Sequence, residues 1–600
     1  MIPASNLLPI ATLREAYLNG SKTPREVLSG ILKACDETDP KIWIERLSSG
    51  AVMARVDGLE GKDPATLPLY GIPFAIKDNI DLAGIPTTAA CPEYAYTPAE
   101  SAPAVARLIE AGAIPVGKTN LDQFATGLVG VRSPLGIPEN PFQKDYIPGG
   151  SSSGSAVAVA RGLVSFALGT DTAGSGRVPA SLNNLVGVKP SCGLVSCTGV
   201  VPACRSLDCV TVFAGTVAEG ALVLDVMAAF DPEDPYSRPM VTPPEPAADP
   251  RSARIGVPRP EQLKFFGNDE AAALFETSIA RSRELGWEVI EIDFEPFLEA
   301  ARLLYEGPWV AERLAAIEPF LEASPDAVFP VTRKIIEGAY GLTAVETFRA
   351  EYRLRALKRK ADAVWESVDA ILTPTLGTPY TTAEVDAEPV QLNSNLGYYT
   401  NFMNLLDYAA VAVPAGFLTK QGMPWGVTLF GPAFRDPFLL SLAARFHAAT
   451  GLLPEGHEPA SAFTAPSLGS SEATIAVAVC GAHLSGLPLN HQLTSRGASL
   501  VEATTTAPVY QMFALPPSDP FPARPGLVRN DALGAAIEIE IWNVPATGFG
   551  SFVDGIGAPL GIGKLALSDG REVSGFLCEF HVIEDAEEIT ALGSWRRYLE

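Results

Sequence analysis

The side chains best suited to chemistry lie in one segment, residues 149–180, which reads GGSSSGSAVAVARGLVSFALGTDTAGSGRVPA. It contains two turns rich in glycine and serine. Each turn precedes a run that predicts a helix, and a strand is predicted between them. N–H groups at the start of a helix have no intrahelical acceptor, and glycine lets a ligand approach the backbone closely. The segment therefore predicts a site where serine hydroxyls lie beside N–H groups that stabilise developing negative charge.

The sequence argues against two other interpretations of this segment. A nucleotide-binding loop would need G-x-x-x-x-G-K-[ST], or G-x-G-x-x-G directly after a strand, and neither pattern is present. A flexible glycine–serine linker would not run directly into apolar strands and helices, as this segment does. The remaining interpretation is a serine nucleophile, whose hydroxyl needs a base to accept its proton.

A lysine is the better candidate for this base than a histidine. No G-x-S-x-G elbow surrounds the serines. All the histidines lie far downstream: His447, His457, His483, His491 and His581. Lys77 ends the apolar strand GIPFAIK, and a lysine can act as a base when burial and neighbouring groups lower its pKa. The sequence therefore offers Lys77 as the partner of the serine-rich segment.

These residues resemble the signature of the amidase signature family of serine amidohydrolases. The family pattern Gly-Gly-Ser-Ser-Gly-Gly-Ser, followed by Gly-Thr-Asp-x-Gly-Gly-Ser-x-Arg-x-Pro-Ala, matches residues 149–180, and G-x-P-x-x-x-K-D matches GIPFAIKD. The resemblance implies that Ser175 is the acylated nucleophile, Lys77 the catalytic lysine, and Ser151, on a cis peptide bond, the proton relay between them. Serine at 153, alanine at 173 and glycine at 176 depart from the commoner family residues, and none of these departures removes a catalytic side chain.

The same resemblance implies an oxyanion hole and a brace beneath it. The oxyanion donors would be the backbone N–H groups of one turn: Thr172, Ala173, Gly174 and Ser175. Asp171 and Arg177 would form a pair that supports this turn. In the implied reaction, neutral Lys77 accepts the proton of Ser175 through Ser151, Ser175 attacks an amide carbonyl, ammonia leaves, and water hydrolyses the acyl-enzyme.

Three features resemble the allophanate hydrolase branch of the family. The first is the amino-acid sequence of the two signature turns themselves. The second is the helix predicted over LLYEGPWVAERLAAIEPF, where Tyr305 and Arg313 are about two turns apart on one face. In allophanate hydrolases a tyrosine and an arginine at this spacing hold the substrate carboxylate, and a guanidinium fork suits that role. The third is the tail, which resembles the C-terminal domain of that branch.

In allophanate hydrolases the C-terminal domain is thought to decarboxylate the N-carboxycarbamate that the amidase releases, and a histidine is thought to act there. His483, in the run GAHLSGLPLN, is the closest match, and His581 is the alternative. A structural histidine remains an equal interpretation of His483. No metal-ligand cluster is apparent in this tail, so a decarboxylation without a cofactor is expected.

The elements that must position these residues alternate between short strands and longer helices. Strands are predicted for YGIPFAIKD, AIPVGKT, SFALGTD, RIGVP and DAILTPT. Helices are predicted for SAPAVARLIEAG, AALFETSIARSRELG and residues 346–368. This alternation predicts an α/β domain around a mixed or largely parallel sheet flanked by helices, which is the amidase-signature fold that the resemblance implies.

Proline-rich stretches at residues 231–254 and 454–474 interrupt this pattern. After the second stretch, the sequence is rich in turns and mostly strand-like. The strand-like segments beyond it include YQMFAL, AIEIEIWNVP and KLALSDGREVSGFLCEFHVI, in which Asp569-Gly570 signals a hairpin. We therefore predict an amidase-signature domain over 1–455, a linker over 456–472 and a small α+β domain over 473–600.

Composition excludes several classes of protein. The chain of 600 residues carries 44 basic and 69 acidic side chains, a net charge of −25, which disfavours nucleic-acid and anionic-membrane partners. No apolar run reaches the length of a membrane span, and no secretory signal is apparent, so a reduced, cytoplasmic protein is expected. Four cysteines cluster without C-x₂-C spacing and are predicted to be small buried thiols: Cys192, Cys197, Cys204 and Cys209.

The leading hypothesis is therefore an allophanate hydrolase that completes urea breakdown after urea carboxylase, and family members are usually homodimers. Three alternatives stay open: another amidase of the family, the amidase subunit of a tRNA-dependent amidotransferase, or a binding protein that keeps the amidase fold.

Overall fold

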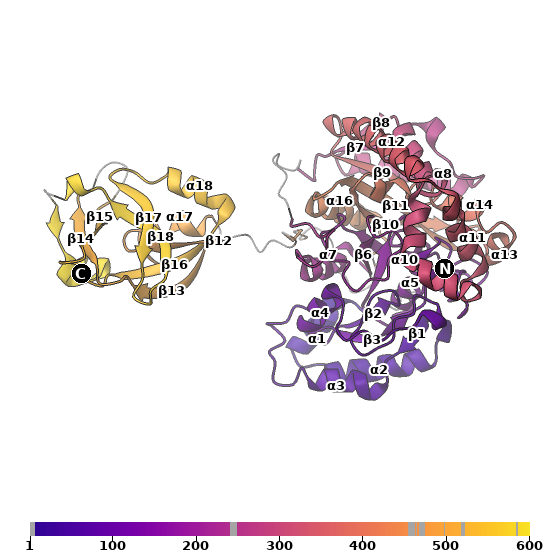
Figure 1. The fold of residues 1–600 in the computed structure, drawn as a ribbon, viewed down its shortest axis with the longest axis horizontal. Coiled ribbons are helices and arrows are strands. Elements are labelled where there is room, and N and C mark those ends of the chain that lie inside the picture. The colour runs from indigo at the N-terminus through magenta and orange to yellow at the C-terminus, as the bar shows by residue number, and fades with distance from the viewer. Residues whose placement is uncertain are drawn as a thin grey trace. The chain divides into compact units, whose positions relative to one another are not determined.

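The computed structural model divides the chain into two compact units, Met1–Gly469 and Ser470–Glu600 (Figure 1). It describes residues 7–240, 249–453, 463, 465, 466, 468, 474–496, 498–517, 522–583 and 586–599. The linker predicted over 456–472 lies outside the described residues except at 463, 465, 466 and 468. Each unit has its own hydrophobic core and is described separately below.

The large unit is built on one mixed sheet of eleven described strands, in the order β1-β3-β2-β4-β6-β5-β10-β11-β9-β7-β8. The strands are β1 Trp43–Arg46, β2 Pro73–Lys77, β3 Ile114–Thr119, β4 Phe166–Asp171, β5 Val186–Lys189, β6 Cys209–Ala214, β7 Arg254–Pro258, β8 Glu288–Ile292, β9 Ala370–Pro374, β10 Tyr408–Leu418 and β11 Met423–Pro432. Parallel pairing joins β2 to β3 and β4, and β7 to β8 and β9, whereas the other pairs are antiparallel. The mixed sheet and its α/β class confirm the prediction.

Helices flank this sheet (Figure 1). They are α1 Ile10–Leu18, α2 Pro24–Asp36, α3 Ser49–Asp57, α4 Pro103–Glu110, α5 Ser153–Ala160, α6 Val178–Leu182, α7 Val217–Met227, α8 Asp269–Glu284, α9 Glu295–Glu306, α10 Trp309–Ala323, α11 Pro330–Glu337, α12 Ala344–Asp362, α13 Thr382–Ala387, α14 Gln391–Leu396, α15 Phe402–Leu405 and α16 Asp436–Ala449. The helix predicted over 346–368 begins two residues earlier, because Thr343 and Glu346 form a capping box.

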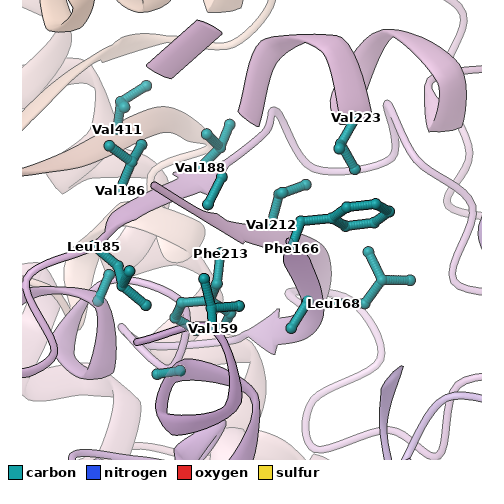
Figure 2. Close-up of a cluster of buried hydrophobic side chains, with 14 of the residues drawn as sticks. Val159, Phe166, Leu168, Leu185, Val186, Val188, Val212, Phe213, Val223 and Val411 are labelled. Carbon is teal, nitrogen blue, oxygen red and sulfur yellow. The ribbon is translucent and has the colours of Figure 1, made fainter. Parts of the chain in front are cut away.

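The core around β4, β5 and β6 fixes the strands that carry the signature segment (Figure 2). Successive side chains of a strand point to opposite faces, so Val212 of β6 points toward Val223 of α7, whereas Phe213 points toward Val159 of α5. Every residue of β2 and β4 is buried, as expected for strands covered on both faces. The two signature turns are therefore held between a rigid sheet and its helices.

The small unit contains a five-stranded sheet, β13-β16-β12-β18-β17, and a three-stranded sheet, β15-β14-β19. Its elements are β12 Thr474–Val479, α17 His491–Thr494, β13 Ser499–Thr505, β14 Tyr510–Leu515, β15 Arg524–Arg529, β16 Glu538–Pro545, α18 Ala546–Asp554, β17 Leu560–Ala566, β18 Glu572–Cys578, β19 Glu587–Glu588 and α19 Trp595–Leu599. Strands β17 and β18 pair antiparallel, and Gly570 between them has a φ of 89°, which confirms the predicted hairpin.

Candidate active site

Three segments meet at the carboxyl ends of two neighbouring strands of the large sheet, β2 and β4. Lys77 is the last residue of β2, which runs parallel to β4, so the carboxyl ends of both strands lie side by side. The first serine-rich turn precedes α5 and carries Ser151, and the second joins β4 to α6 and carries Ser175. Lys77 and Ser151 are fully buried and Ser175 is 3% exposed, so all three are removed from bulk water.

Lys77 is bonded to the first of the two serines. Its Nζ lies 2.7 Å from Ser151 Oγ and 2.7 Å from Thr170 Oγ1 of β4. The peptide bond between Gly150 and Ser151 is cis, as the family resemblance implies. Burial lowers the pKa of Lys77 to about 7, although nearby carboxylates, of which Asp122 acts most strongly, oppose this shift. A substantial fraction of Lys77 is therefore neutral near pH 7 and able to accept a proton.

The hydroxyl of Ser175 points to a different acceptor. It donates to the carbonyl oxygen of Gly127 at 3.4 Å, and it makes no hydrogen bond with Ser151 in the part of the chain that the structure describes. Hydrogen bonds therefore connect Lys77 to Ser151 but do not continue from Ser151 to Ser175. For proton transfer, the hydroxyl of Ser175 would have to break its hydrogen bond to Gly127 and donate to Ser151 instead. Catalytic hydrogen bonds that are absent or long without substrate commonly form or shorten when substrate binds.

The turn after β4 presents three unpaired N–H groups. Those of Thr172, Ala173 and Ser175 have no acceptor among the described residues. The N–H of Gly174, which was predicted to be a fourth oxyanion donor, instead donates to Asp171 Oδ1 at 2.7 Å. The prediction for Gly174 is therefore corrected, because its N–H is already paired with a buried carboxylate. A Cβ at this position would lie 2.5 Å from Thr400 Oγ1, so only glycine fits.

Asp171 and Arg177 brace this turn as predicted from the signature. Arg177 donates to both oxygens of Asp171 through Nε and Nη2, each at 2.9 Å, and both side chains are fully buried. Asp171 also accepts the N–H of Gly176 at 3.0 Å. Burial acts to raise the pKa of Asp171, but Arg177, together with Lys189 and the N–H of Gly176, outweighs burial and holds the pKa below the usual range.

Replacing Asp171 by asparagine should destabilise the large unit. The change leaves the Arg177 charge buried without its partner, which costs about 3–5 kcal/mol for pairs of this kind. Denaturant unfolding followed by fluorescence should show the loss. Asp326→Asn is the matched control, because Asp326 forms an exposed pair with Arg333 and should leave the unfolding free energy unchanged. Equal stability of the two variants would contradict a bracing role for Asp171.

Two further carboxylates support the site and were not found from the sequence. Asp122 accepts the N–H groups of Gly130 at 2.9 Å and Arg132 at 2.8 Å, and its own N–H donates to the carbonyl of Ser151 at 3.0 Å. It thereby ties the loop that carries Gly127 to the first serine turn. The hydroxyl of Thr172 donates to Asp208, whose pKa burial raises to about 6. Nothing distinguishes these acids in the sequence except their position beside strands β3 and β6.

Tyr305 and Arg313 lie on two helices rather than on the single helix predicted. α9 ends at Glu306 and α10 begins at Trp309, because Gly307 and Pro308 interrupt the segment and proline has no N–H to donate. The two side chains still meet, with the Arg313 guanidinium 5.6 Å from the centre of the Tyr305 ring. The prediction of one helix was wrong, whereas the predicted proximity of the two residues holds.

Arg313 also reaches the loop that contacts the second serine. Its Nη1 donates to Thr126 Oγ1 at 3.1 Å, and the next residue, Gly127, supplies the carbonyl bonded to Ser175. Arg313 is only 3% exposed, and it makes no other hydrogen bond among the described residues. Burial acts to lower the pKa of Arg313, but neighbours including Cys204 and Tyr305 outweigh it and raise the pKa, so the side chain is a cation. A fixed positive charge therefore lies near Ser175.

The two candidate histidines of the small unit have different surroundings. His483 lines a pocket, donates through Nε2 to Gln492 Oε1 at 3.0 Å, and stacks on Phe576 with ring centres 5.2 Å apart. Burial lowers the pKa of His483, which favours its neutral form. His581 has 70% of its side chain exposed and lies 3.3 Å from Glu579. The pocket therefore distinguishes His483 from His581.

The cysteine cluster consists of thiols. Cys204 and Cys209 are buried and Cys192 and Cys197 are half-buried, and the sulfur atoms of Cys192 and Cys209 are 3.4 Å apart. The described residues contain no group of three or more histidines, cysteines and acids arranged to hold a metal ion. Among the same residues, no helix combines the length and the apolar character that a membrane crossing needs.

Comparison with known proteins identifies both units. Residues 26–440 match the amidase family model, and residues 475–600 match the allophanate hydrolase C-terminal domain. The chain is 45% identical to the urea amidolyase of Saccharomyces cerevisiae over 93% of its own length and 31% of that protein, so it spans about a third of this relative. It is 33% identical to a glutamyl-tRNA(Gln) amidotransferase subunit of Synechococcus over 75% of its length and 97% of that relative.

Among solved structures, the chain resembles the allophanate hydrolase of Kluyveromyces lactis at 39% identity, with a TM-score of 0.72 and 99% of each chain covered. It resembles the urea amidolyase of the same yeast with a TM-score of 0.73, covering 99% of this chain and 37% of that one. The chain therefore belongs to the amidase family and carries, after its amidase unit, the C-terminal domain typical of allophanate hydrolases.

Proposed function

We propose that the protein is an allophanate hydrolase that cleaves the terminal amide of allophanate and releases ammonia. One observation carries the proposal: Arg313 is bonded to Thr126, and the adjacent Gly127 is bonded to Ser175. A buried cation beside the candidate nucleophile suits a small substrate that has an amide at one end and a carboxylate at the other. The likeness to Kluyveromyces lactis allophanate hydrolase over the whole chain supports the same substrate.

In the proposed reaction, neutral Lys77 takes a proton from Ser151 as Ser151 takes one from Ser175. Ser175 Oγ then forms a bond to the amide carbon, and the carbonyl oxygen gains negative charge. The N–H groups of Thr172, Ala173 and Ser175 stabilise that charge. The relay returns the proton to the amide nitrogen, the C–N bond breaks and ammonia leaves. Water then attacks the acyl-enzyme by the same route, which frees Ser175 and N-carboxycarbamate.

Arg313 and Tyr305 are proposed to bind the substrate carboxylate. The Tyr305 ring, half-buried against the guanidinium, limits its orientations, and the N–H groups of Arg313 that are unpaired among the described residues can bind two oxygens. The chain as a whole carries a charge of −25, which would repel an anionic substrate. The local cation is therefore required to make binding of allophanate favourable.

Arg313→Met should lower kcat/KM for allophanate by about 100-fold or more, because the charge-assisted hydrogen bonds to the carboxylate are lost. Biuret is the matched substrate, since it replaces the carboxylate of allophanate by a neutral amide. Its turnover should change far less. Arg302→Met, which removes an exposed arginine of α9, is the control variant. A similar loss for both substrates would mean that Arg313 supports the fold rather than the carboxylate.

We further propose that the small unit decarboxylates N-carboxycarbamate and that His483 acts in this step. The pocket lined by His483 supports this choice over His581. His483→Ala should leave the first ammonia release intact and delay carbon dioxide release, with N-carboxycarbamate visible by ¹³C NMR from labelled allophanate. His581→Ala and His491→Ala should resemble the unmodified protein. A delay in His581→Ala alone would transfer the role to that residue.

We also propose where the substrate comes from, the compartment of the protein and its oligomeric state. Relatives named urea amidolyase are about three times as long as this chain, which supports a functional link to a urea carboxylase that supplies allophanate. We propose a cytoplasmic homodimer without a cofactor, as the family resemblance implies. The amidotransferase relative covers 75% of this chain over 97% of its own length, whereas residues 475–600 match the allophanate hydrolase C-terminal domain, which favours the allophanate assignment over that alternative.

A further inference from the structure

Two cysteines of the large unit lie beside each other at the start of β6. Strands β5 and β6 pair antiparallel, so the loop that follows β5 runs alongside the first residue of β6. Cys192 lies in this loop, Cys209 is that first residue, and their sulfur atoms are 3.4 Å apart. A disulfide needs about 2.05 Å between its sulfur atoms, so closing this bond requires an approach of about 1.4 Å. Neither cysteine takes part in the proposed amide hydrolysis.

A buried cation favours the thiolate form of Cys192. Lys189 is 1% exposed, and its Nζ lies 4.0 Å from Cys192 Sγ. The other acceptors of this Nζ are two backbone carbonyls at 2.9 and 2.7 Å, and no carboxylate lies within ion-pair distance of it in the part of the chain that the structure describes. Arg238 donates to the carbonyl of Cys192 at 2.7 Å, and it is paired with Asp407. The unpaired charge beside the sulfur is therefore that of Lys189.

The thiol of Cys209 reinforces this state. It donates to Cys192 Sγ, and this hydrogen bond does most to lower the pKa of Cys192 to about 7. Lys189 and Arg238 lower that pKa further, whereas burial and Asp407 oppose the shift. The pKa of Cys209 is raised, because ionisation would end the hydrogen bond and burial disfavours the charge. A half-buried thiolate next to a protonated thiol is suited to oxidation of the first sulfur and resolution by the second.

We propose that Cys192 and Cys209 form a reversible disulfide when the protein meets hydrogen peroxide, and that this bond slows the amidase. The Cys192 thiolate attacks one peroxide oxygen, so an S–O bond forms, the O–O bond breaks, and the departing hydroxide takes up a proton and becomes water. The thiol of Cys209 then attacks the sulfenic acid, an S–S bond forms, the S–O bond breaks, and the leaving hydroxide takes the proton of Cys209. The two sulfur atoms lose two electrons in total, and the peroxide gains them.

The disulfide would act on the turn after β4, whose N–H groups are the proposed oxyanion donors. Cys209 is the register partner of Asp171, the residue that precedes this turn. Asn404 Nδ2 donates to the carbonyl of Asp171 at 2.8 Å and lies 3.8 Å from the sulfur of Cys209. Asp208, next to Cys209, accepts the hydroxyl of Thr172 in the turn itself. Movement of Cys209 toward its partner therefore displaces the turn. This effect rests on the proposed function, whereas formation of the disulfide does not.

Peptide mapping of the full-length protein tests the disulfide. The protein is treated with hydrogen peroxide, its remaining thiols are blocked with N-ethylmaleimide, and it is digested without reduction. Mass spectrometry should show a peptide that links Cys192 to Cys209, and dithiothreitol should remove it. Cys192→Ser should lack this peptide. Cys197→Ser is the matched control and should keep it, because Cys197 is half-buried in the same cluster but burial raises its pKa and keeps it protonated.

Labelling of Ser175 by a fluorophosphonate measures the effect of the disulfide without allophanate. Peroxide should slow this labelling by about tenfold or more, part of the 10²- to 10³-fold that loss of one oxyanion donor costs, and dithiothreitol should restore it. Cys192→Ser should label at nearly the same rate before and after peroxide. Absence of the linked peptide, a linked peptide without slower labelling, or equal slowing in Cys192→Ser would overturn the proposal. A protein that shows the full peroxide response but leaves allophanate intact would contradict the proposed function alone.

Discussion

Ser175→Ala should abolish ammonia release from allophanate, with kcat falling by about 10⁴-fold or more. Losing the nucleophile removes the covalent route, and only binding and oxyanion stabilisation remain. Ser175 is 3% exposed and its hydroxyl makes one hydrogen bond, to Gly127, so the substitution removes little packing. The measurement is the steady-state rate of ammonia release at saturating allophanate.

Ser181→Ala is the matched control for this variant. Ser181 lies in α6, shortly after Ser175, it is equally buried, and its hydroxyl has no partner among the described residues. Its removal should therefore leave both activity and stability nearly unchanged. A fluorophosphonate probe should label the unmodified protein and Ser181→Ala at Ser175, and should not label Ser175→Ala. Full activity in Ser175→Ala would exclude a serine mechanism at this turn.

Lys77→Met should lower kcat by about 10²- to 10⁴-fold, because a general base contributes about that much. Methionine fills the same buried space without the amine. Lys77→Arg separates charge from basicity, since arginine keeps a positive charge and does not deprotonate in proteins. We expect both variants to be inactive. Activity in Lys77→Arg close to that of the unmodified protein would show that position 77 supplies charge rather than a base.

The pH dependence of the unmodified enzyme should follow the protonation of Lys77. The neutral amine is the active form, and burial lowers its pKa to about 7. Therefore kcat/KM for allophanate should be nearly constant above pH 8 and fall about tenfold per pH unit well below 7. A profile that stays flat down to pH 5.5 would contradict a lysine base with this pKa.

Local motifs were enough to predict the candidate catalytic residues, because these residues lie in or next to two turns that the sequence specifies locally. Lys77, Ser151 and Ser175 come from three segments, yet each lies at the end of a strand or in a turn that its own neighbours specify. The Asp171–Arg177 pair is equally local, being six residues apart. The sequence predicted an α/β domain with a mixed sheet, but it did not predict the order of the strands. Strand order and register depend on contacts between residues distant in sequence.

The parts of the site that escaped prediction depend on tertiary contacts. Asp122 and Asp208 act through hydrogen bonds to loops and turns that the sequence does not place. The N–H of Gly174 is paired because Asp171 turns back onto its own loop, which only the folded geometry reveals. The break between α9 and α10 was different, since Gly307-Pro308 is a local helix-ending signal that should have outweighed the helical spacing of Tyr305 and Arg313.

The most direct test of the account compares substrates for the purified full-length protein. Initial rates of ammonia release are measured with allophanate, malonamate and glutamine, with Ser175→Ala as the blank. The account predicts that kcat/KM for allophanate exceeds that for glutamine by at least about 100-fold, because the carboxylate and amide of allophanate fit Arg313 and Ser175 together. Turnover of glutamine or malonamate with allophanate inert would contradict it.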